Sequence, residues 1–385
     1  MHRTIAATLC AWLAVPVGAV EVSVAYLEVV QPLPPVLSEL EVRPEGLGLD
    51  GAEVAREDNA TTGQFLGQTY ALTAFVVEDG DDLAAVAQEA LAAAPFLIVD
   101  GPSEALQAIA DLPEAAGALV FNASEGDPIL RSEGCRANLL HTAPSTAMRT
   151  DALAQFLTLR RWDDLVLIEG THAADIDYAA ALEGSLAKFG LEIGARKTWA
   201  FDADMRRNAA AEVPLFTQDL GDYDALLLAD ELGDFGRFVL YNTWEPRPVA
   251  GSEGLTAVAW APVVEQWGAI QLQNRFAEVA ERTMAPEDYA AWAAMRAIGE
   301  AVTRTESADP TEVRAFLLSD EFELAGFKGR PLTFRTWNGQ LRQPIPIVHP
   351  RALVANAPLE GFLHQRTELD TLGLDEPESG CLAFQ

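Results

Sequence analysis

Short apolar runs alternate with longer segments of helical spacing along the first part of the chain. The apolar runs have the length and residue types of strands, and the segments between them repeat apolar residues three and four positions apart, as amphipathic helices do. The predicted strands are 21–28, 70–78, 95–99, 118–121 and 138–142. The predicted helices are 49–59, 82–93 and 103–111. This alternation predicts a parallel sheet covered by helices on both faces.

The same rhythm restarts near Ala143–Ala147, which predicts a second α/β unit. Its predicted strands are 164–168, 191–201, 224–229 and 256–260, and its predicted helices are 147–159, 175–189 and 285–305. We therefore expect two lobes, each with a doubly wound parallel sheet, joined by a hinge. The expected boundaries are an N-terminal lobe over 20–143, completed by part of 330–385, a C-terminal lobe over 144–330, and a hinge crossover and tail over 331–385.

The extreme N-terminus has the pattern of a secretory signal peptide. A basic start at Met1–Arg3 leads into the apolar segment Ile5–Val17, and the small residues Gly18 and Ala19 follow. The apolar segment is shorter than the about 20 residues that a membrane-spanning helix needs. We expect residues 1–19 to be removed on export, which leaves a periplasmic protein without stable membrane insertion.

Composition limits the partners of the protein. The chain has 385 residues, 49% of them hydrophobic, and a formal net charge of −32 at pH 7. Such a chain can build two packed cores, whereas its negative charge disfavours binding to nucleic acid or to an anionic membrane. We expect a soluble monomer.

Two cysteines remain after removal of the segment that carries Cys10. They are Cys135 and Cys381. Two cysteines in an oxidising compartment favour one disulfide, which would tie the C-terminal tail to the first lobe. Two unpaired thiols are the alternative, because the sequence does not give their distance.

Motifs of common enzyme classes are missing from the sequence. It contains no Gly-x-Ser-x-Gly, no His-Glu-x-x-His and no phosphate-binding Gly-Lys-Ser/Thr. The glycines from Gly46 to Gly51 have dinucleotide-binding spacing, but the polar segment before them contains Pro44 where a buried strand is required. Acidic pairs such as Asp230 and Glu231 carry little weight in so acidic a chain. We expect neither catalysis nor a catalytic cofactor.

The first candidate binding residues follow predicted strands. Ser103, Asn122 and Ser124 come directly after the third and fourth strands of the first lobe. Ligands of open parallel sheets bind beyond the carboxyl ends of the strands, and clefts between domains are preferred ligand sites. We therefore place these three residues at a cleft between the lobes.

Several segments resemble one protein family. Gly51–Asn59 followed by Thr62-Gly63 and Gly67, then Phe96–Gly101 and Tyr289–Arg296, are similar to segments of type I periplasmic binding proteins, the branched-chain amino-acid class of ABC transporter substrate-binding proteins. The resemblance extends over nearly the whole mature chain. It implies capture of a small molecule by closure of the lobes and its delivery to an ABC transporter permease.

A narrower resemblance concerns a subgroup of that family. The segments that carry it are Leu139–Ser145, Arg247–Ser252, Glu265–Gly268, Arg335–Pro344, Glu368–Gly373 and Pro377–Ser379. They are similar to binding proteins associated with PQQ-dependent alcohol dehydrogenase systems. This resemblance implies pyrroloquinoline quinone (PQQ), or a related compound, as the ligand and a quinoprotein dehydrogenase system as a partner.

A site for PQQ needs aromatic faces for its flat rings and cations or N–H donors for its three carboxylates. The second lobe offers five candidates in or near loops: His172, Trp244, Arg247, Trp260 and Trp267. Core packing is the alternative for the tryptophans, and a surface ion pair is the alternative for the arginine. A further cluster, Arg335, Trp337 and Arg342, surrounds a predicted hairpin turn at Asn338-Gly339, and we expect it to brace the hinge.

Two other functions stay open at the level of sequence. The first is binding of another small anion or of an amino acid. The second is a periplasmic accessory or sensor subunit that docks on a partner protein through its acidic surface.

Overall fold

The computed structural model describes residues 19–32, 43–200 and 205–385. The predicted signal peptide therefore lies outside the described residues except for Ala19. Across the described part of the chain, no helix is long and apolar enough to cross a membrane.

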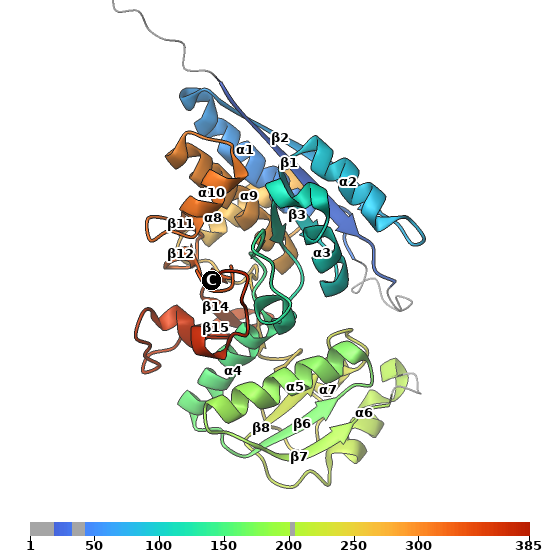
Figure 1. The fold of residues 1–385 in the computed structure, drawn as a ribbon. Coiled ribbons are helices and arrows are strands. Elements are labelled where there is room, and N and C mark those ends of the chain that lie inside the picture. The colour runs from blue at the N-terminus through green and yellow to red at the C-terminus, as the bar shows by residue number, and fades with distance from the viewer. Residues whose placement is uncertain (1–18, 33–42, 201–204) are drawn as a thin grey trace, which may run out of the picture.

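The first lobe contains a five-stranded parallel sheet with the order β2-β1-β3-β4-β5. The strands are β1 (Val20–Val29), β2 (Gln68–Val77), β3 (Phe96–Asp100), β4 (Leu119–Asn122) and β5 (Leu139–His141). Helices α2 (Leu83–Ala93) and α3 (Ser103–Ala110) cover one face, and α1 (Leu49–Leu66) and α9 (Pro286–Thr305) cover the other (Figure 1). A short 3₁₀ segment, η2 (Pro113–Gly117), precedes β4. Because both faces are covered, every residue of β3 is buried, as its uninterrupted apolar run predicted.

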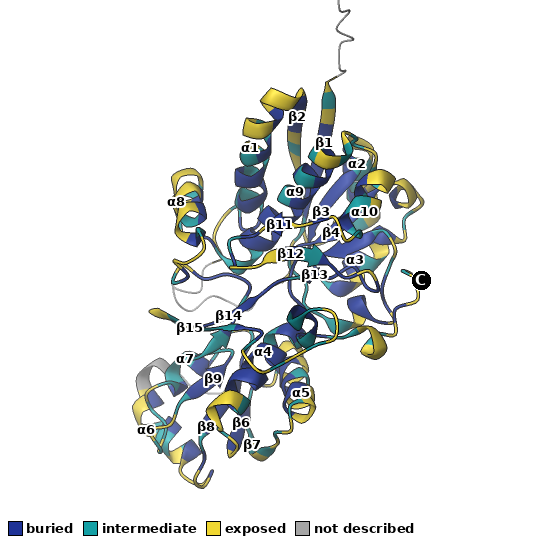
Figure 2. Ribbon diagram, turned by 90° about the vertical axis from the view of Figure 1, so that its left-hand side faces the viewer, coloured by how far each residue is buried: buried dark blue, intermediate teal, exposed yellow. Residues whose placement is uncertain are grey.

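The second lobe contains a four-stranded parallel sheet with the order β7-β6-β8-β9. The strands are β6 (Leu165–Glu169), β7 (Ile193–Thr198), β8 (Ala225–Ala229) and β9 (Val249–Gly251). Helices α4 (Thr146–Arg160) and α5 (Ala173–Lys188) pack on one face, and α6 (Met205–Thr217) and α7 (Gly236–Val239) pack on the other. The predicted pair of parallel-sheet α/β lobes is confirmed, and Figure 2 shows the buried strands inside each lobe.

The second lobe was expected to span residues 144–330, but part of this range packs in the core of the first lobe. Helix α9 joins the core of the first lobe, where Trp292 and Met295 are buried in one cluster with Val24 and Ile98. Helices α8 (Ala269–Ala280) and α10 (Pro310–Leu317) also pack there. The reason is that an amphipathic pattern shows which side of a helix is buried but not which sheet it covers.

The hinge region holds two small antiparallel sheets. One has the order β10-β14-β15, formed by β10 (Thr256–Ala257), β14 (Ile345–His349) and β15 (Ala352–Ala357). The predicted strand 256–260 therefore pairs with β14 instead of extending the second lobe's sheet. The other sheet has β11 (Leu324–Ala325), β12 (Pro331–Phe334) and β13 (Leu341–Arg342). The predicted hairpin at Asn338-Gly339 joins β12 to β13.

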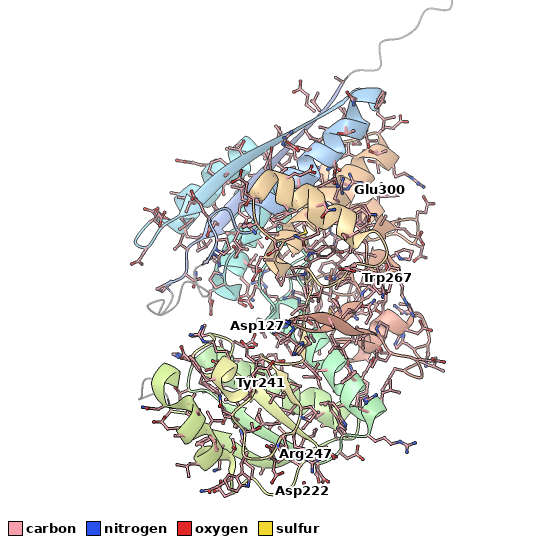
Figure 3. All side chains as sticks on the ribbon, turned by 180° about the vertical axis from the view of Figure 1, so that it is seen from behind. Asp127, Asp222, Tyr241, Arg247, Trp267 and Glu300 are labelled. Atoms are coloured by element: carbon pink, nitrogen blue, oxygen red, sulfur yellow. A yellow bond between two sulfur atoms is a disulfide. The ribbon has the colours of Figure 1, made fainter. Side chains whose placement is uncertain are left out.

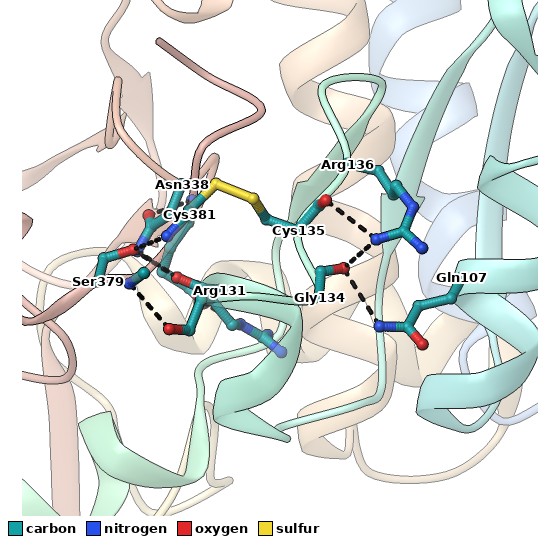
Figure 4. The surroundings of a disulfide bond; sticks show 11 residues. Gln107, Arg131, Gly134, Cys135, Arg136, Asn338, Ser379 and Cys381 are labelled. Carbon is teal, nitrogen blue, oxygen red and sulfur yellow. Dashed lines mark hydrogen bonds between the residues drawn. A yellow bond between two sulfur atoms is a disulfide. The ribbon is translucent and has the colours of Figure 1, made fainter.

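The C-terminal tail is tied to the first lobe by the disulfide Cys135–Cys381, which confirms the predicted pairing (Figure 4). Cys135 follows the 3₁₀ segment η3 (Pro128–Arg131). Beside the disulfide, the hydroxyl of Ser379 donates to the carbonyl oxygen of Arg131 at 2.8 Å. The tail includes the 3₁₀ segments η4 (Glu368–Thr371) and η5 (Glu376–Glu378).

The same tail is also bound to the second lobe and to the hinge. Asp151 of α4 accepts a hydrogen bond from the backbone N–H of Gly373 at 2.7 Å, and the Lys188 ammonium donates to the Gly373 carbonyl at 3.0 Å. From the hinge, Arg335 contacts Asp370 at 3.0 Å. Tail residues 368–381 thus connect both lobes at the hinge.

Because α1 and α9 lie in close contact, we expect a side chain at Gly51 of α1 to destabilise the protein. A Cβ atom at Gly51 would lie 1.9 Å from the backbone oxygen of Asp288, so we expect Gly51→Ala to cost about 1–3 kcal/mol of unfolding free energy. The control is Gly184→Ala on the exposed side of α5, where a Cβ meets nothing within 4 Å and where alanine should stabilise the helix by about 0.5–1 kcal/mol. Urea unfolding of both variants tests this, and equal stabilities would contradict the close packing of α9 on the first lobe.

Candidate functional site

A cleft of about 1180 Å³ lies between the two lobes. On the first lobe its wall is formed by the loops that follow β3, β4 and β5, together with the start of α9. On the second lobe its wall is formed by α4, α5 and the loops that follow β8 and β9. The carboxyl ends of both parallel sheets therefore face one cavity, which is where this sheet type places its ligands.

The loop after β4 shapes the wall of the first lobe. The side chain of Asn122 is fully buried, and its oxygen accepts hydrogen bonds from the backbone N–H groups of Ser124 at 3.2 Å and Glu125 at 2.8 Å. Ser124 accepts a bond from the Gly101 N–H at 3.0 Å. The hydroxyl of Ser103 donates to Asp127 at 3.0 Å. Ser103 and Ser124 are both part of the cleft lining. Their hydroxyls, however, form hydrogen bonds to other residues of the wall.

The wall of the second lobe is organised around an ion pair. Arg149 binds the Glu231 carboxylate through two nitrogens, at 2.9 and 3.3 Å, and donates to the Ala257 carbonyl at 3.1 Å. Ser252 donates to the same carboxylate at 2.9 Å. Asp175 accepts the backbone N–H of Glu231 at 2.7 Å and thereby positions it. Each of the three nitrogens of Arg149 thus donates one hydrogen bond within the wall.

The lining of the cleft is strongly acidic. Among the described residues, its single basic residue is Arg149, and its acidic residues are Glu104, Glu125, Asp127, Asp177, Asp230, Glu231 and Glu287. The carboxylate of Asp230 has a structural use, because it accepts the backbone N–H groups of Asp234, Phe235 and Gly236. Figure 3 shows Asp127 between the two lobes.

Burial makes the negative charges of this lining unfavourable, because it removes the carboxylates from water. Desolvation raises the pKa of Glu125, against the lowering effect of the neighbouring N–H groups and of Arg131. Desolvation also raises the pKa of Glu287, and the nearby carboxylates Asp100 and Asp288 raise it further. For both carboxyl groups burial is the largest cause of the raised pKa, because desolvation disfavours the charged form.

Tyr178 is the one aromatic residue in the lining. It projects from α5, is 2% exposed, and lies under the guanidinium of Arg149, whose central carbon is 5.3 Å from the ring centre. Its hydroxyl is buried without a hydrogen-bond partner in the described part of the chain. Desolvation raises its pKa, so the phenol stays protonated at neutral pH. A buried hydroxyl without a partner is costly unless a ligand satisfies it.

Three of the predicted site residues of the second lobe lie outside this lining. His172 precedes α5, and its ring nitrogen binds Asp234 at 2.7 Å. Trp244 is 57% exposed, and Arg247 pairs with Asp222 at 2.7 Å at the far end of the lobe (Figure 3). The latter two precede β9, a strand that the sequence analysis did not predict, so they lie at its amino end, away from the cleft.

The other two predicted tryptophans also have structural positions outside the lining. Trp260 is 2% exposed, stacks on Tyr289 with ring centres 4.8 Å apart, and donates to Gln273 at 3.2 Å. Trp267 packs against Gly329 before α8 and is 43% exposed. None of the three predicted tryptophans therefore offers an aromatic face to a flat quinone in the cleft.

Sequence reasoning missed most of the lining. Glu125 and Asp127 follow the carboxyl end of β4, as Ser124 does, and Glu231 follows the carboxyl end of β8. Their positions after strands could therefore have predicted that they line the cleft. Glu287 gave no such signal, because it reaches the cleft from a helix assigned to the other lobe. Within the described residues, no group of three or more histidine, cysteine, aspartate or glutamate side chains is arranged to hold a metal ion.

Comparisons by sequence find no matching family model and no matching curated protein. Solved structures do match. A branched-chain amino-acid ABC transporter periplasmic ligand-binding protein from Burkholderia xenovorans LB400 has a TM-score of 0.71 at 15% identity, over 94% of this chain and 100% of that one. A periplasmic binding protein from Burkholderia mallei has a TM-score of 0.66 at 14% identity, over 96% and 100%.

A third similar structure contains a ligand. It is a solute-binding protein of an ABC transporter from R. palustris in complex with benzoate, with a TM-score of 0.64 at 13% identity, over 94% of this chain and 99% of that one. At these identities the similarity establishes the fold. The chain has the two-lobed α/β fold of type I periplasmic binding proteins, and the similar structures include the branched-chain amino-acid class.

Proposed function

We propose that this protein is the substrate-binding component of an ABC importer and that it captures a small molecule in the cleft between its lobes. The observation that carries the proposal is the position of the cleft, which is lined by the strand ends of both sheets. A ligand held there contacts both lobes at once and favours their closure by hinge motion. The proposal includes neither catalysis nor a catalytic cofactor.

A periplasmic location accompanies this proposal. The sequence predicts a signal peptide over residues 1–19, and the Cys135–Cys381 disulfide suits an oxidising compartment. The similar structures include proteins described as periplasmic.

PQQ, the ligand implied by the sequence resemblance, fits this cleft poorly. Its three carboxylates would face the seven acidic residues of the lining, and the only lining cation, Arg149, is already paired with Glu231. No tryptophan is part of the lining. We therefore propose neither PQQ nor a quinoprotein dehydrogenase partner.

Filling the cleft tests the proposed function. Ala174 is an exposed residue of α5 that lines the cleft, so Ala174→Trp should obstruct the ligand without disturbing a core. We expect at least a 100-fold loss of affinity with an unchanged urea midpoint, whereas Ala92→Trp, on the exposed side of α2, should bind normally. The measurement is calorimetric titration with any small molecule that stabilises the protein in a thermal-shift screen of cationic, anionic and neutral metabolites. A complete absence of hits, or hits that bind Ala174→Trp as tightly as the unmodified protein, would refute the proposal.

A further inference from the structure

We infer that the ligand is an organic cation that carries ammonium or guanidinium groups, such as a di- or polyamine or a guanidino compound. This inference rests on the proposed function and narrows it to a substrate class. It follows from three features of the cleft: an excess of carboxylates, their presence on both walls, and a buried hydroxyl without a partner.

The excess of carboxylates is large after the internal ion pair is removed. Glu231 is compensated by Arg149, and Asp230 by backbone N–H groups of its own loop. Glu125 and Asp127 are likewise bonded within their own loop, by the backbone N–H groups of Asp127 and Ile129, each at 2.9 Å. The remaining lining carboxylates are Glu104, Asp177 and Glu287. Within the described residues, no arginine or lysine forms an ion pair with any of these three. Arg43 and Arg149 attract Glu287, but each is already paired with another carboxylate. In a partly desolvated cleft, such an excess favours a positively charged ligand and opposes a negatively charged one.

The remaining carboxylates come from both lobes. Glu104 and Glu287 belong to the wall of the first lobe, and Asp177 belongs to the wall of the second. Within the described residues, the side chains of Glu104 and Asp177 make no hydrogen bond or ion pair, and the Glu287 carboxylate accepts its own backbone N–H. Carboxylates on opposite walls repel each other as the lobes approach, so closure without a ligand is disfavoured. A ligand with two or more positive groups removes this repulsion and binds both walls at once.

The hydroxyl of Tyr178 is a second and independent sign of a ligand. It belongs to a cleft-lining side chain that is 98% buried, one turn of α5 away from Ala174 and directly after Asp177, and it lacks a partner among the described residues. Since burial keeps the phenol protonated, its oxygen can accept an N–H bond from an ammonium or guanidinium group. Satisfying this oxygen adds specificity that carboxylates alone do not supply.

An anionic ligand and a metal ion both fit this cleft less well. A carboxylate ligand needs cations or N–H donors to balance its charge. Among the described residues, the one lining cation already donates to Glu231 and to the Ala257 carbonyl. A metal ion would need three or more clustered side-chain ligands, which the described part of the chain does not provide.

The test is calorimetric titration of the mature protein, at low ionic strength and pH 7.5, with putrescine, spermidine, agmatine and L-arginine. Matched titrations use succinate, benzoate, L-leucine and calcium chloride. We expect saturable binding of at least one of the cations, weakened when the salt concentration is raised, because screening reduces attraction between charges. Selective binding of succinate, benzoate or leucine, or of calcium alone, would overturn the inference.

Two neutralising variants locate the cation in the cleft. We expect Asp177→Asn and Glu287→Gln each to weaken the best cation about 10- to 100-fold, because each removes one charge-assisted contact. Asp222→Asn is the matched control, since it removes one exposed carboxylate at the far end of the second lobe (Figure 3) and should change affinity less than twofold. Equal effects of all three variants would show a general charge effect and would overturn the assignment.

The outcomes separate this inference from the proposed function. If an anionic or neutral molecule binds and Ala174→Trp abolishes that binding, the cleft remains the substrate site and the cationic class is wrong. If no molecule of any charge binds, the proposed function itself fails. If cations bind but Ala174→Trp, Asp177→Asn and Glu287→Gln all leave their affinity unchanged, cation binding takes place elsewhere and the inference is wrong.

Discussion

Replacing Cys135 and Cys381 together by serine is expected to lower the free energy of unfolding by about 5 kcal/mol. The two cysteines are separated by 246 positions, so the disulfide closes a very long loop of the unfolded chain. The chain-entropy relation gives this magnitude because the cost of closing a loop grows with the logarithm of its length. The folded tail keeps its other contacts, such as the bond from Ser379 to Arg131, so we expect the double variant to retain the native fold.

Urea unfolding of the oxidised protein and of the double-serine variant measures the effect. The unmodified protein treated with dithiothreitol is the control, because it also lacks the disulfide and should unfold at nearly the same urea concentration as the variant. A difference of less than about 1 kcal/mol between the oxidised protein and the variant would contradict a stabilising role of this disulfide.

Replacing Arg335 by methionine is expected to destabilise the protein by about 3–5 kcal/mol. Arg335 is 1% exposed and faces the buried carboxylate of Asp370 at 3.0 Å. It also donates to the carbonyl oxygens of Leu369, Leu372 and Leu374 in the tail. Methionine fills a similar volume but removes these three donors, and the Leu369 oxygen then keeps the backbone N–H of Leu372 at 3.4 Å. Among the described residues, Asp370 keeps its contact with Arg342 at 2.8 Å.

The matched control is Arg330→Met. Arg330 forms an ion pair with Glu368, a residue of the same tail, but both side chains are 43% exposed. Exposed ion pairs contribute about 0–1 kcal/mol, so this variant should unfold almost as the unmodified protein does. Similar losses in the two variants, measured by urea unfolding, would contradict the importance of burial at Arg335.

These two predictions concern one structural unit. Tail residues 368–381 are held by the disulfide to the first lobe, by Arg335 to the hinge, and through Gly373 to Asp151 of the second lobe. The expected bracing of the hinge by Arg335, Trp337 and Arg342 agrees with these contacts. Trp337 lies between arginines, with the guanidinium carbons of Arg335 and Arg342 at 5.4 and 5.1 Å from its ring. The hinge and the tail therefore form a connected, largely buried structure next to the cleft.

The sequence by itself determined the strands of the two parallel sheets, except β9, and the two-lobed plan. The uninterrupted apolar runs at β3 and β8 predicted strands buried on both faces, and the restart of the pattern placed the first crossover near Ala143–Ala147, directly before α4. It also placed Ser103 and Ser124 at the cleft, because the residues after parallel strands share one edge of the sheet. Each of these inferences depends on the local pattern of apolar and polar residues. This pattern indicates which residues are buried.

Only the tertiary structure decided which surfaces meet. Helix α9 covers the first sheet although it follows the second in sequence, and it brings Glu287 to the cleft opposite Asp177. Trp260 stacks on Tyr289 in a core instead of facing a ligand. The charge of the cleft is set by residues from Glu104 to Glu287 that are far apart in sequence, and in an acidic chain no single one of them stands out. Their negative charges add up because the folded chain brings these residues close together. The order of residues in the sequence does not give these distances.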